Sequence, residues 1–451
     1  MKYWYEEAVF YHIYPLGLTG APRENTGEKR DGFARLKLWI PYMKEMGFTA
    51  LYIGPLFESS THGYDTKDYR KVDVRLGSNE DFKEFVSLCH EAGIRVVVDG
   101  VFNHTGREFF AFQDIRANRE NSRYKDWYKG INFWGNTRYN DGFGYEAWRN
   151  CFELVNLNLW NREVKDYLFD VIRFWMDEFD IDGIRLDCAD CLDFEFMKEM
   201  RRITIQKKPD FWLMGEVIHG DYSRWANDEM LHSVTNYELH KGLYSGHNDY
   251  NYFEIAHTVR RLSDENGGIC KGRKLYSFTD NHDVERLMSK LARKEDYYPV
   301  QMLLYTLPGI PSIYYGSEWG MEGRKANGDD GPLRPAIDIT KRAELDNEYS
   351  AYIAKLGKLH RENPELAYGR YRELMLKNRQ YVFGRYLDDS VVMVAVNNDD
   401  VPAVVEATAG FDGENAVDLF TGGEIAAGEN GRVRLEIPAH RGCMIRMERK
   451  K

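Results

Sequence analysis

Short apolar runs alternate with helical patterns along the first two-thirds of the chain, and this alternation constrains the fold more than any other feature. Residues 8–15 and 48–55 predict the first two strands, and the third, from Ile94 to Asp99, is β-branched and continuous like a strand buried on both faces. Further strands are expected to end near Asp187, Glu216, Asn236, Asp280 and Gly316. Parallel strands that alternate with helices favour a closed (β/α)8 barrel when they number eight.

The helical segments between these runs carry start and stop residues. Ser78 followed by Asp81 predicts a capping box at a helix start, and Gly93 supplies a left-handed stop. Another helix is expected to open at Asn161 and to carry apolar residues along one side. Pro41 lies inside the first helical stretch, where it predicts a kink or an early stop.

Two segments depart from the alternation and divide the chain. Residues 103–158 form a long, aromatic-rich connection after the third strand, typical of a functional insertion or a small subdomain. From residue 368 on, short alternating strands separated by Asn, Asp and Gly turns predict an antiparallel β domain. We therefore expect an α/β protein with three parts: a (β/α)8 TIM barrel of residues 1–102 and 159–367, an insertion subdomain of 103–158, and a C-terminal β-sandwich of 368–451.

The overall composition disfavours several classes of partner. The net charge of −11 argues against nucleic acid and anionic membranes, since both are polyanions, and no run approaches the ~20 apolar residues of a membrane span. The N-terminus lacks the long apolar core of a signal peptide, and the six cysteines are too scattered for a disulfide framework. We therefore expect a cytoplasmic protein that acts on a neutral substrate.

Charged and polar side chains gather at the predicted carboxyl ends of four strands. These strand ends are DGVFNH (99–104), DGIRLD (182–187), WLMGE (212–216) and FTDNHD (278–283). In a barrel the carboxyl ends of the strands meet at one rim, where the loops are free to vary. Charged groups that converge in a cleft repel each other or must be desolvated, so folding alone does not require them there. We therefore expect a catalytic site at this rim.

The four segments resemble the signature regions of the α-amylase superfamily, glycoside hydrolase family 13, in order and in position. Within the superfamily the resemblance is to the neopullulanase, cyclomaltodextrinase and maltogenic amylase group, and further segments share it: HGYDTKDY (62–69), YYG (314–316) and DGPLR (330–334). The resemblance covers nearly the whole chain. That group usually carries an extra N-terminal β domain, which we do not expect here because residues 8–15 already predict the first strand.

The resemblance implies a retaining α-glycosidase with three catalytic carboxylates. Asp187 would be the nucleophile, Glu216 would act first as general acid and then as base, and Asp283 would brace the hydroxyls of a distorted sugar. Retaining enzymes hold the first two groups about 5–5.5 Å apart. Mere salt-bridge partnership is the structural alternative for these acids.

The resemblance also implies residues that bind the substrate. Arg185 would keep the nucleophile ionised, two histidines would donate hydrogen bonds to the sugar, a tyrosine would stack beneath it, and an Asp/Arg pair would grip the next sugars. These residues are Arg185, His104, His282, Tyr64, Asp330 and Arg334. All of them except Arg185 have an ordinary alternative: helix capping or loop bridging for the histidines, core packing for the tyrosine, and a surface ion pair for an Asp and an Arg four residues apart.

The implied reaction is hydrolysis of α-1,4, and also α-1,6, glucosidic bonds in maltodextrins, starch fragments or cyclodextrins through a covalent glycosyl-Asp187 intermediate. Glucanotransferases, glucoside isomerases and phosphorylases use the same carboxylates, so transfer stays an alternative. A non-catalytic carbohydrate-binding barrel is disfavoured because all three carboxylates are present. The implied partner is an α-glucan, and the sequence leaves monomer and homo-oligomer open.

The implied chemistry requires no cofactor. Asn103 corresponds to a calcium-ligand position in many α-amylases, which leaves calcium open, although the sequence does not reveal the further oxygen ligands that calcium needs. Cys188 and Cys191 have the C-x-x-C spacing of redox and zinc sites, but no second Cys/His pair lies at ligand spacing, so we expect two ordinary thiols. Related enzymes often carry Asn-Glu or Lys-His where this chain has Asp190 and Cys191, so the acceptor side of the cleft departs from theirs.

Overall fold

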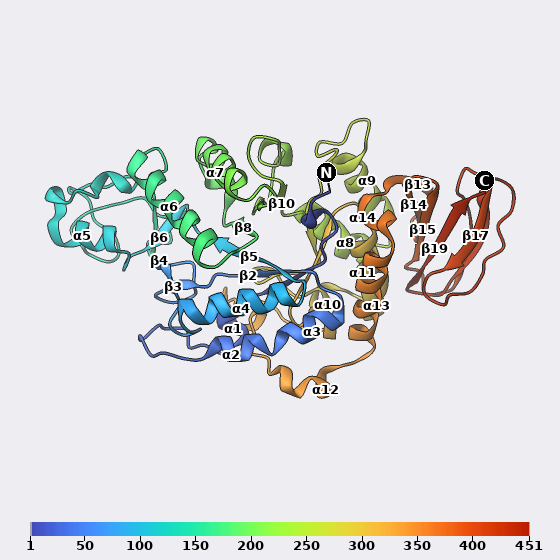
Figure 1. The fold of residues 1–451 in the computed structure, drawn as a ribbon, viewed down its shortest axis with the longest axis horizontal. Helices are drawn as coiled ribbons and strands as arrows, with labels where there is room; N and C mark the ends of the chain where they lie inside the picture. Colours follow the sequence, from blue (N-terminus) through green and yellow to red (C-terminus); the bar gives the residue numbers. More distant parts are fainter. Residues whose placement is uncertain (1, 451) are drawn as a thin grey trace.

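The computed structural model describes residues 2–450, and its centre is an eight-stranded parallel sheet rolled into a barrel (Figure 1). The sheet has the order β10-β9-β8-β5-β2-β1-β12-β11, and a parallel bridge between Thr235 and Tyr276 joins its two edges. The strands are β1 (Phe10–Ile13), β2 (Ala50–Ile53), β5 (Arg95–Gly100), β8 (Gly183–Leu186), β9 (Trp212–Gly215), β10 (Ser233–Val234), β11 (Tyr276–Phe278) and β12 (Ile310–Tyr314). The predicted barrel is confirmed.

Helices cover the outside of the barrel, most of them with one buried and one exposed face, whereas α11 (Tyr297–Thr306) is buried all round. The long ones are α2 (Gly32–Lys37), α3 (Trp39–Met46), α4 (Asn79–Glu91), α6 (Arg162–Glu178), α7 (Phe194–Lys207), α8 (Tyr237–Asn248), α9 (Tyr252–Ser263), α11 (Tyr297–Thr306) and α13 (Glu348–Glu362). Short helices are α1 (Pro15–Leu18), α10 (Leu287–Lys290), α12 (Arg342–Leu345) and α14 (Pro364–Tyr368). Ser78 caps α4, Gly93 follows it with φ +80°, and Asn161 caps α6, as predicted.

The first helical stretch breaks three residues before Pro41. Leu38 separates α2 from α3, and Pro41 is the third residue of α3. The amide of a third helical residue has no intrahelical partner in any case, so the proline is tolerated there without a kink. The predicted interruption exists, but it lies at Leu38 and not at Pro41.

Large side chains fill the barrel interior below the carboxyl ends of the strands. Phe10, Tyr52, Trp212 and Tyr276 belong to one buried cluster, with the Phe10 and Trp212 rings 5.0 Å apart. This packing closes the lower part of the barrel, as alternating layers of side chains do in such folds. The polar side chains that could react with a substrate therefore lie at the rim formed by the carboxyl ends of the strands.

The connection after the third barrel strand forms a small lobe at one end of the molecule (Figure 1). It contains β6 (His104–Gly106), which pairs antiparallel with β7 (Leu154–Asn156), and helix α5 (Phe110–Asn118). A hairpin, β3 (Phe57–Ser59) and β4 (Thr66–Val72), precedes α4 in the chain, and its strand β4 contacts β6. Some of the lobe's aromatic residues form its core, Trp148 lines the cleft described below, and Trp134 is exposed to solvent. The buried ones are Phe109, Phe112, Trp127, Tyr128, Phe143 and Tyr145.

Two antiparallel sheets form the C-terminal part at the opposite end (Figure 1). The larger has the order β13-β14-β15-β19-β17, and β16 pairs with β18 in the smaller. The strands are β13 (Arg370–Leu376), β14 (Gln380–Leu387), β15 (Ser390–Asn397), β16 (Ala403–Thr408), β17 (Gly413–Asp418), β18 (Arg432–Ile437) and β19 (Arg441–Arg449). One face of the larger sheet packs on the barrel core and its other face on the smaller sheet.

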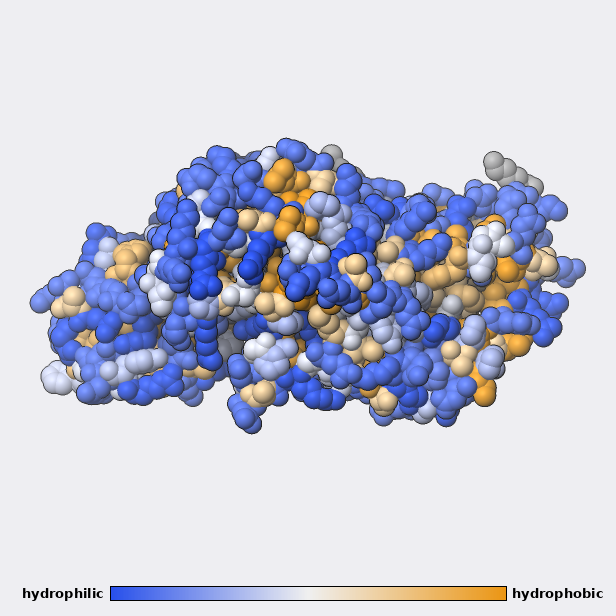
Figure 2. All heavy atoms as spheres, turned by 90° about the horizontal axis from the view of Figure 1, so that it is seen from below, coloured by the Kyte–Doolittle hydropathy of each residue, from blue (hydrophilic) through white to orange (hydrophobic). Residues whose placement is uncertain are grey.

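The outer surface is polar over the face shown in Figure 2, where apolar residues appear only in scattered groups. Among residues 2–450, none of the helices combines the length and the apolar character that crossing a membrane requires.

Candidate active site

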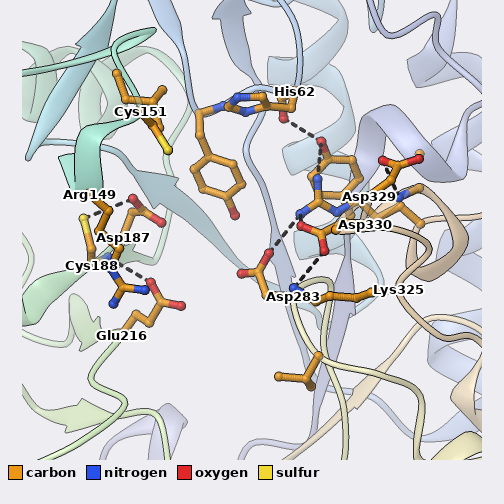
Figure 3. Close-up of a pocket in the computed structure, with 18 of the residues that line it drawn as sticks. His62, Arg149, Cys151, Asp187, Cys188, Glu216, Asp283, Lys325, Asp329 and Asp330 are labelled. Atoms are coloured by element: carbon orange, nitrogen blue, oxygen red, sulfur yellow. Dashed lines mark hydrogen bonds and ion pairs between the residues drawn. The ribbon is translucent and has the colours of Figure 1, made fainter. Parts of the chain in front are cut away.

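The carboxyl ends of the barrel strands open into a cleft of about 1200 Å³. Asp187 and Glu216 lie on one side of it and Asp283 on the other (Figure 3). The predicted residues that line the cleft are Tyr64, His104, Asp187, Glu216, Asp283, Asp330 and Arg334. Arg185 and His282 lie directly behind its wall, each almost fully buried.

Arg185 holds two of the carboxylates on one guanidinium group. Its Nη1 lies 2.9 Å from Oδ1 of Asp187, and its Nη2 lies 2.9 Å from Oε2 of Glu216. Asp187 directly follows β8 and Glu216 directly follows β9, neighbours in the sheet, so the barrel register brings them together. Both acids therefore do form salt bridges, but with a shared partner at the base of an open cleft.

The groups around Asp187 act on its ionisation in opposite directions. Burial raises the pKa of Asp187 well above its usual range, Arg185 opposes this shift, and the nearby carboxylate of Glu216 adds to it. Asp187 therefore lies between a cation that favours its charged form and a carboxylate that opposes it.

Asp283 is held ionised on the other side of the cleft. Its Oδ2 lies 3.0 Å from Nε2 of His282, and its Oδ1 accepts a hydrogen bond from Nη2 of Arg334 at 2.9 Å. Burial alone would raise the pKa of Asp283, but His282 and Arg334 outweigh that effect and hold it well below the usual range. This carboxylate is therefore a fixed negative charge facing the acid pair.

Arg334 joins Asp283 to Asp330. Its Nη2 also lies 3.1 Å from Oδ2 of Asp330, whose Oδ1 is 2.8 Å from Nζ of Lys325. The Arg334 side chain is only 13% exposed. The surface ion pair that i, i+4 spacing alone would allow is thus part of a charged network that reaches the cleft.

Tyr64 and the two histidines are fixed by different contacts. The Tyr64 hydroxyl donates to Oδ2 of Asp99 at 3.1 Å and lies 2.5 Å from Nε2 of His282. His104 has an unpartnered, buried Nε2 at the cleft wall, and its Nδ1 lies 3.2 Å from the Asn103 amide. Neither histidine caps a helix, so the capping alternative does not apply to them.

Several cleft residues lie outside the sequence-based set. Asp99 accepts hydrogen bonds from Arg185 and from the hydroxyls of Tyr52 and Tyr64, so it anchors the whole base of the site. Asp99 is the first residue of the DGVFNH segment, so its place at a strand end could have indicated this role. The lobe adds Trp148, Arg149 and Glu153, and α8 adds Tyr237, Lys241 and Tyr244. Sequence reasoning had no local signal for these loop and helix residues.

The surroundings of Asn103 do not fit calcium. Its side-chain amide lies near a ring nitrogen of His104 and, at 3.3 Å, near Oδ1 of Asn156. Calcium takes six to eight oxygen ligands, several of them usually carboxylates. A nitrogen and an amide oxygen do not make such a set, so no step of the reaction is assigned to calcium.

The two cysteines of the C-x-x-C segment have different environments. Cys188 is buried at the cleft wall, whereas Cys191 is exposed. A hydrogen bond between the two thiols raises the pKa of Cys188 well above its usual range and lowers the pKa of Cys191. The Cys188 backbone N–H donates to Oε2 of Glu216 at 2.9 Å, so this residue also positions the acid.

Comparison with known protein families gives a match to the model named "Alpha amylase, catalytic domain" over residues 35–361. Among similar proteins, a cyclomaltodextrinase from Thermoanaerobacter pseudethanolicus is 31% identical over 89% of this chain and 72% of its own length. Neopullulanase 2 from Thermoactinomyces vulgaris is 32% identical, covering 98% of this chain and 78% of that protein.

Solved structures share the same architecture. A cyclomaltodextrinase superposes with a TM-score of 0.87 at 26% identity, covering 99% of this chain and 78% of that one. A debranching enzyme from Nostoc punctiforme superposes with a TM-score of 0.83 at 27% identity, covering 99% of this chain and 100% of that one. The likeness therefore extends over the barrel, the lobe and the C-terminal sheets.

Proposed function

Because this chain belongs to the α-amylase family of glycoside hydrolases, we propose that it hydrolyses α-1,4 glucosidic bonds in maltodextrins, starch fragments or cyclodextrins. The observation that carries the proposal is the pair Asp187 and Glu216 on one guanidinium, opposite Asp283 in an open cleft. Cleavage of α-1,6 bonds is a second activity of the same site, supported by the similarity to a debranching enzyme.

In the first step the carboxylate of Asp187 attacks the anomeric carbon while Glu216 donates its proton to the glycosidic oxygen. The bond to the leaving sugar breaks, and a glycosyl-Asp187 ester forms. In the second step Glu216 takes a proton from water, which attacks the same carbon and releases Asp187. Two inversions at one carbon give net retention, so the product first appears as the α anomer.

The charged residues of the cleft explain how one enzyme supplies both a nucleophile and an acid. Arg185 stabilises the carboxylate of Asp187 that attacks, and Glu216, on the other nitrogen of the same guanidinium, is the carboxyl group that donates the proton. Asp283 cannot take that proton because His282 and Arg334 stabilise its charge. It is left to accept hydrogen bonds from sugar hydroxyls and to favour positive charge at the anomeric carbon.

Transfer to another sugar is the alternative fate of the same intermediate. Asp190, where related enzymes often carry a different residue, lines the same cleft as the acid pair, and so do Tyr237, Lys241 and Tyr244. An acceptor sugar that binds there would compete with water. Transfer is therefore a second activity on the same carboxylates.

The deciding experiment is a product time course on maltoheptaose, maltose and sucrose with wild type and Asp187→Asn. Wild type is expected to release shorter maltodextrins, and longer products than the substrate would reveal transfer. Asp187→Asn is expected to lose several orders of magnitude in rate because the covalent route is closed. Asp177→Asn, a change of the same type at a 64% exposed carboxylate, is the matched control and is expected to behave as wild type.

Near-normal turnover by Asp187→Asn would contradict the assignment of the nucleophile. Rapid hydrolysis with no sensitivity to Glu216→Gln would contradict the assignment of the acid. Both variants keep the shape of the side chain, so folding is checked by unfolding curves beside the kinetics.

We also propose that the enzyme acts in the cytoplasm and that its chemistry needs no cofactor. The six cysteines are free, and a similar protein from Bacillus subtilis is named intracellular maltogenic amylase. Carboxylates, a guanidinium and imidazoles supply each proton and charge that the two steps require. An α-glucan is the partner that this chemistry implies.

A further inference from the structure

The Cys188 thiol is a nucleophilic group in the cleft that the hydrolytic steps do not use. It immediately follows the proposed nucleophile, and its Sγ lies 3.3 Å from Oδ2 of Asp187 (Figure 3). Arg185 binds the other oxygen, Oδ1. The Oδ2 atom is therefore paired only with a thiol, a weak hydrogen-bond donor.

A third group completes a compact cluster. Nε2 of His104 is buried, has no hydrogen-bond partner, and belongs to a residue that lines the same cleft. The ligand atoms of His104, Asp187 and Cys188 all lie within 4.8 Å of one another, and residues 2–450 contain no other such group of three His, Cys, Asp or Glu side chains. A ring nitrogen, a thiol sulfur and a carboxylate oxygen are thus close enough to approach one ion.

This mixture of atoms is the ligand set that zinc prefers. Zn²⁺ binds imidazole nitrogen and carboxylate oxygen at roughly 2.0–2.2 Å and thiolate sulfur at about 2.3 Å, in a tetrahedral arrangement. A neutral imidazole offers one unprotonated ring nitrogen to a metal ion. The Asn103 side-chain amide lies 3.2 Å from Nδ1 and contacts the ring from behind.

We propose that His104, Asp187 and Cys188 form a site for a borderline or soft divalent cation such as Zn²⁺, with water as the fourth ligand. Binding replaces the thiol proton, which is released to solvent, and creates no redox step. The cation would occupy a carboxylate oxygen of Asp187 and a ring nitrogen of His104. Its inhibitory consequence rests on the proposed function, because a bound sugar ring would contact the same two side chains.

The first test measures the metal site without any substrate. Co²⁺ is titrated into the protein as a coloured substitute for Zn²⁺, and a thiolate-to-cobalt charge-transfer band is expected to saturate at one equivalent. Zn²⁺ is expected to displace the cobalt. Cys188→Ala is expected to remove the band, and His104→Ala to weaken binding at least about tenfold, as loss of even an outer-shell partner does.

Cys191→Ala is the matched control, since it removes the exposed thiol of the same segment. It is expected to keep the band and to change the affinity by less than about threefold, well below the loss expected for a ligand. Cys188→Ser serves as a second variant if the alanine variant unfolds. A wild-type protein without the band, or a Cys188 variant that keeps it, would overturn the metal site.

The second test measures the consequence for hydrolysis. Zn²⁺ is expected to inhibit maltoheptaose cleavage competitively and reversibly on addition of a chelator, with Mg²⁺ inactive at the same concentration because it prefers oxygen ligands. Cys188→Ala is expected to resist Zn²⁺ relative to its own metal-free rate. Noncompetitive inhibition, or equal sensitivity of Cys188→Ala, would overturn the inference. The cobalt titration needs no turnover, so its outcome is independent of the proposed activity.

Discussion

Arg334 is a residue whose meaning depends on contacts that sequence spacing cannot reveal. Its partner Asp330 lies four residues away, but its partner Asp283 lies 51 residues away, after another strand. Its Nε also donates to the backbone carbonyl of His282 at 3.0 Å. The guanidinium therefore fixes the position of the Asp283 carboxylate and its ionisation together.

Replacing Arg334 with lysine keeps the positive charge but removes the planar fork. Charge-assisted hydrogen bonds contribute about 1.5–3 kcal/mol each, so kcat/KM is expected to fall by roughly ten- to a hundredfold. Arg342→Lys is the matched control, because Arg342 makes a fork-to-fork pair with Glu45 on the outer surface. Steady-state kinetics on maltoheptaose measure both, and a wild-type kcat/KM for Arg334→Lys would show that the network is dispensable.

The elements that the sequence predicts best are those with local chemical signals. The α4 cap is one: the Asp81 amide lies 3.3 Å from the Ser78 hydroxyl, and the Ser78 amide donates to the Asp81 carboxylate at 2.8 Å. Strands β13 and β19 have a weaker local signal, because arginine and glutamate interrupt their apolar alternation. Register with β14 and β15 stabilises them instead.

Ser78→Ala is expected to lower the free energy of unfolding by about 1 kcal/mol, the usual contribution of an N-terminal cap. Ser87→Ala on the exposed face of the same helix is the control, and it is expected to be neutral or slightly stabilising because alanine has the higher helix propensity. Urea unfolding followed by circular dichroism compares the two variants. Equal effects would mean that the capping box does not stabilise α4.

At the scale of the whole molecule, Asp182 joins several layers on the amino side of β8. Its buried carboxylate accepts hydrogen bonds from the Val96 amide at 2.8 Å, Lys208 at 2.9 Å and Arg95 at 3.0 Å, and it lies 2.7 Å from His90 Nε2. Burial alone would raise its pKa, but these partners lower the pKa of Asp182 from 3.8 to about 2. The carboxylate thus links α4, β5 and β8 away from the cleft.

A depressed carboxyl pKa contributes stability above the unfolded-state value and loses it as the pH falls toward the folded-state value. Asp182→Asn is therefore expected to lower the free energy of unfolding by about 2 kcal/mol near neutral pH. This value follows from the lowered pKa of Asp182, because a change of one in pKa corresponds to about 1.4 kcal/mol. The difference from wild type should shrink as the pH falls from 3.8 toward about 2. Urea unfolding across this range measures it, and a difference independent of pH would refute the linkage.

The sequence predicted the barrel and the residues gathered at its rim, because strand periodicity and strand-end segments are local features. It did not reveal that Asp187 and Glu216 share one guanidinium, that Asp99 anchors the site, or that Cys188 faces the nucleophile. These relations depend on the register between neighbouring strands and on side-chain direction. Such quantities are fixed by packing of the complete barrel and have no signature within a short window of sequence.

The anomeric configuration of the first product tests the central claim most directly. Maltoheptaose is mixed with enzyme at high concentration, and proton NMR spectra are recorded before mutarotation proceeds. A glycosyl-Asp187 intermediate predicts that the new reducing end appears as the α anomer, with the β anomer growing in later. Initial release of the β anomer would mean a single displacement by water and would contradict the paired action of Asp187 and Glu216.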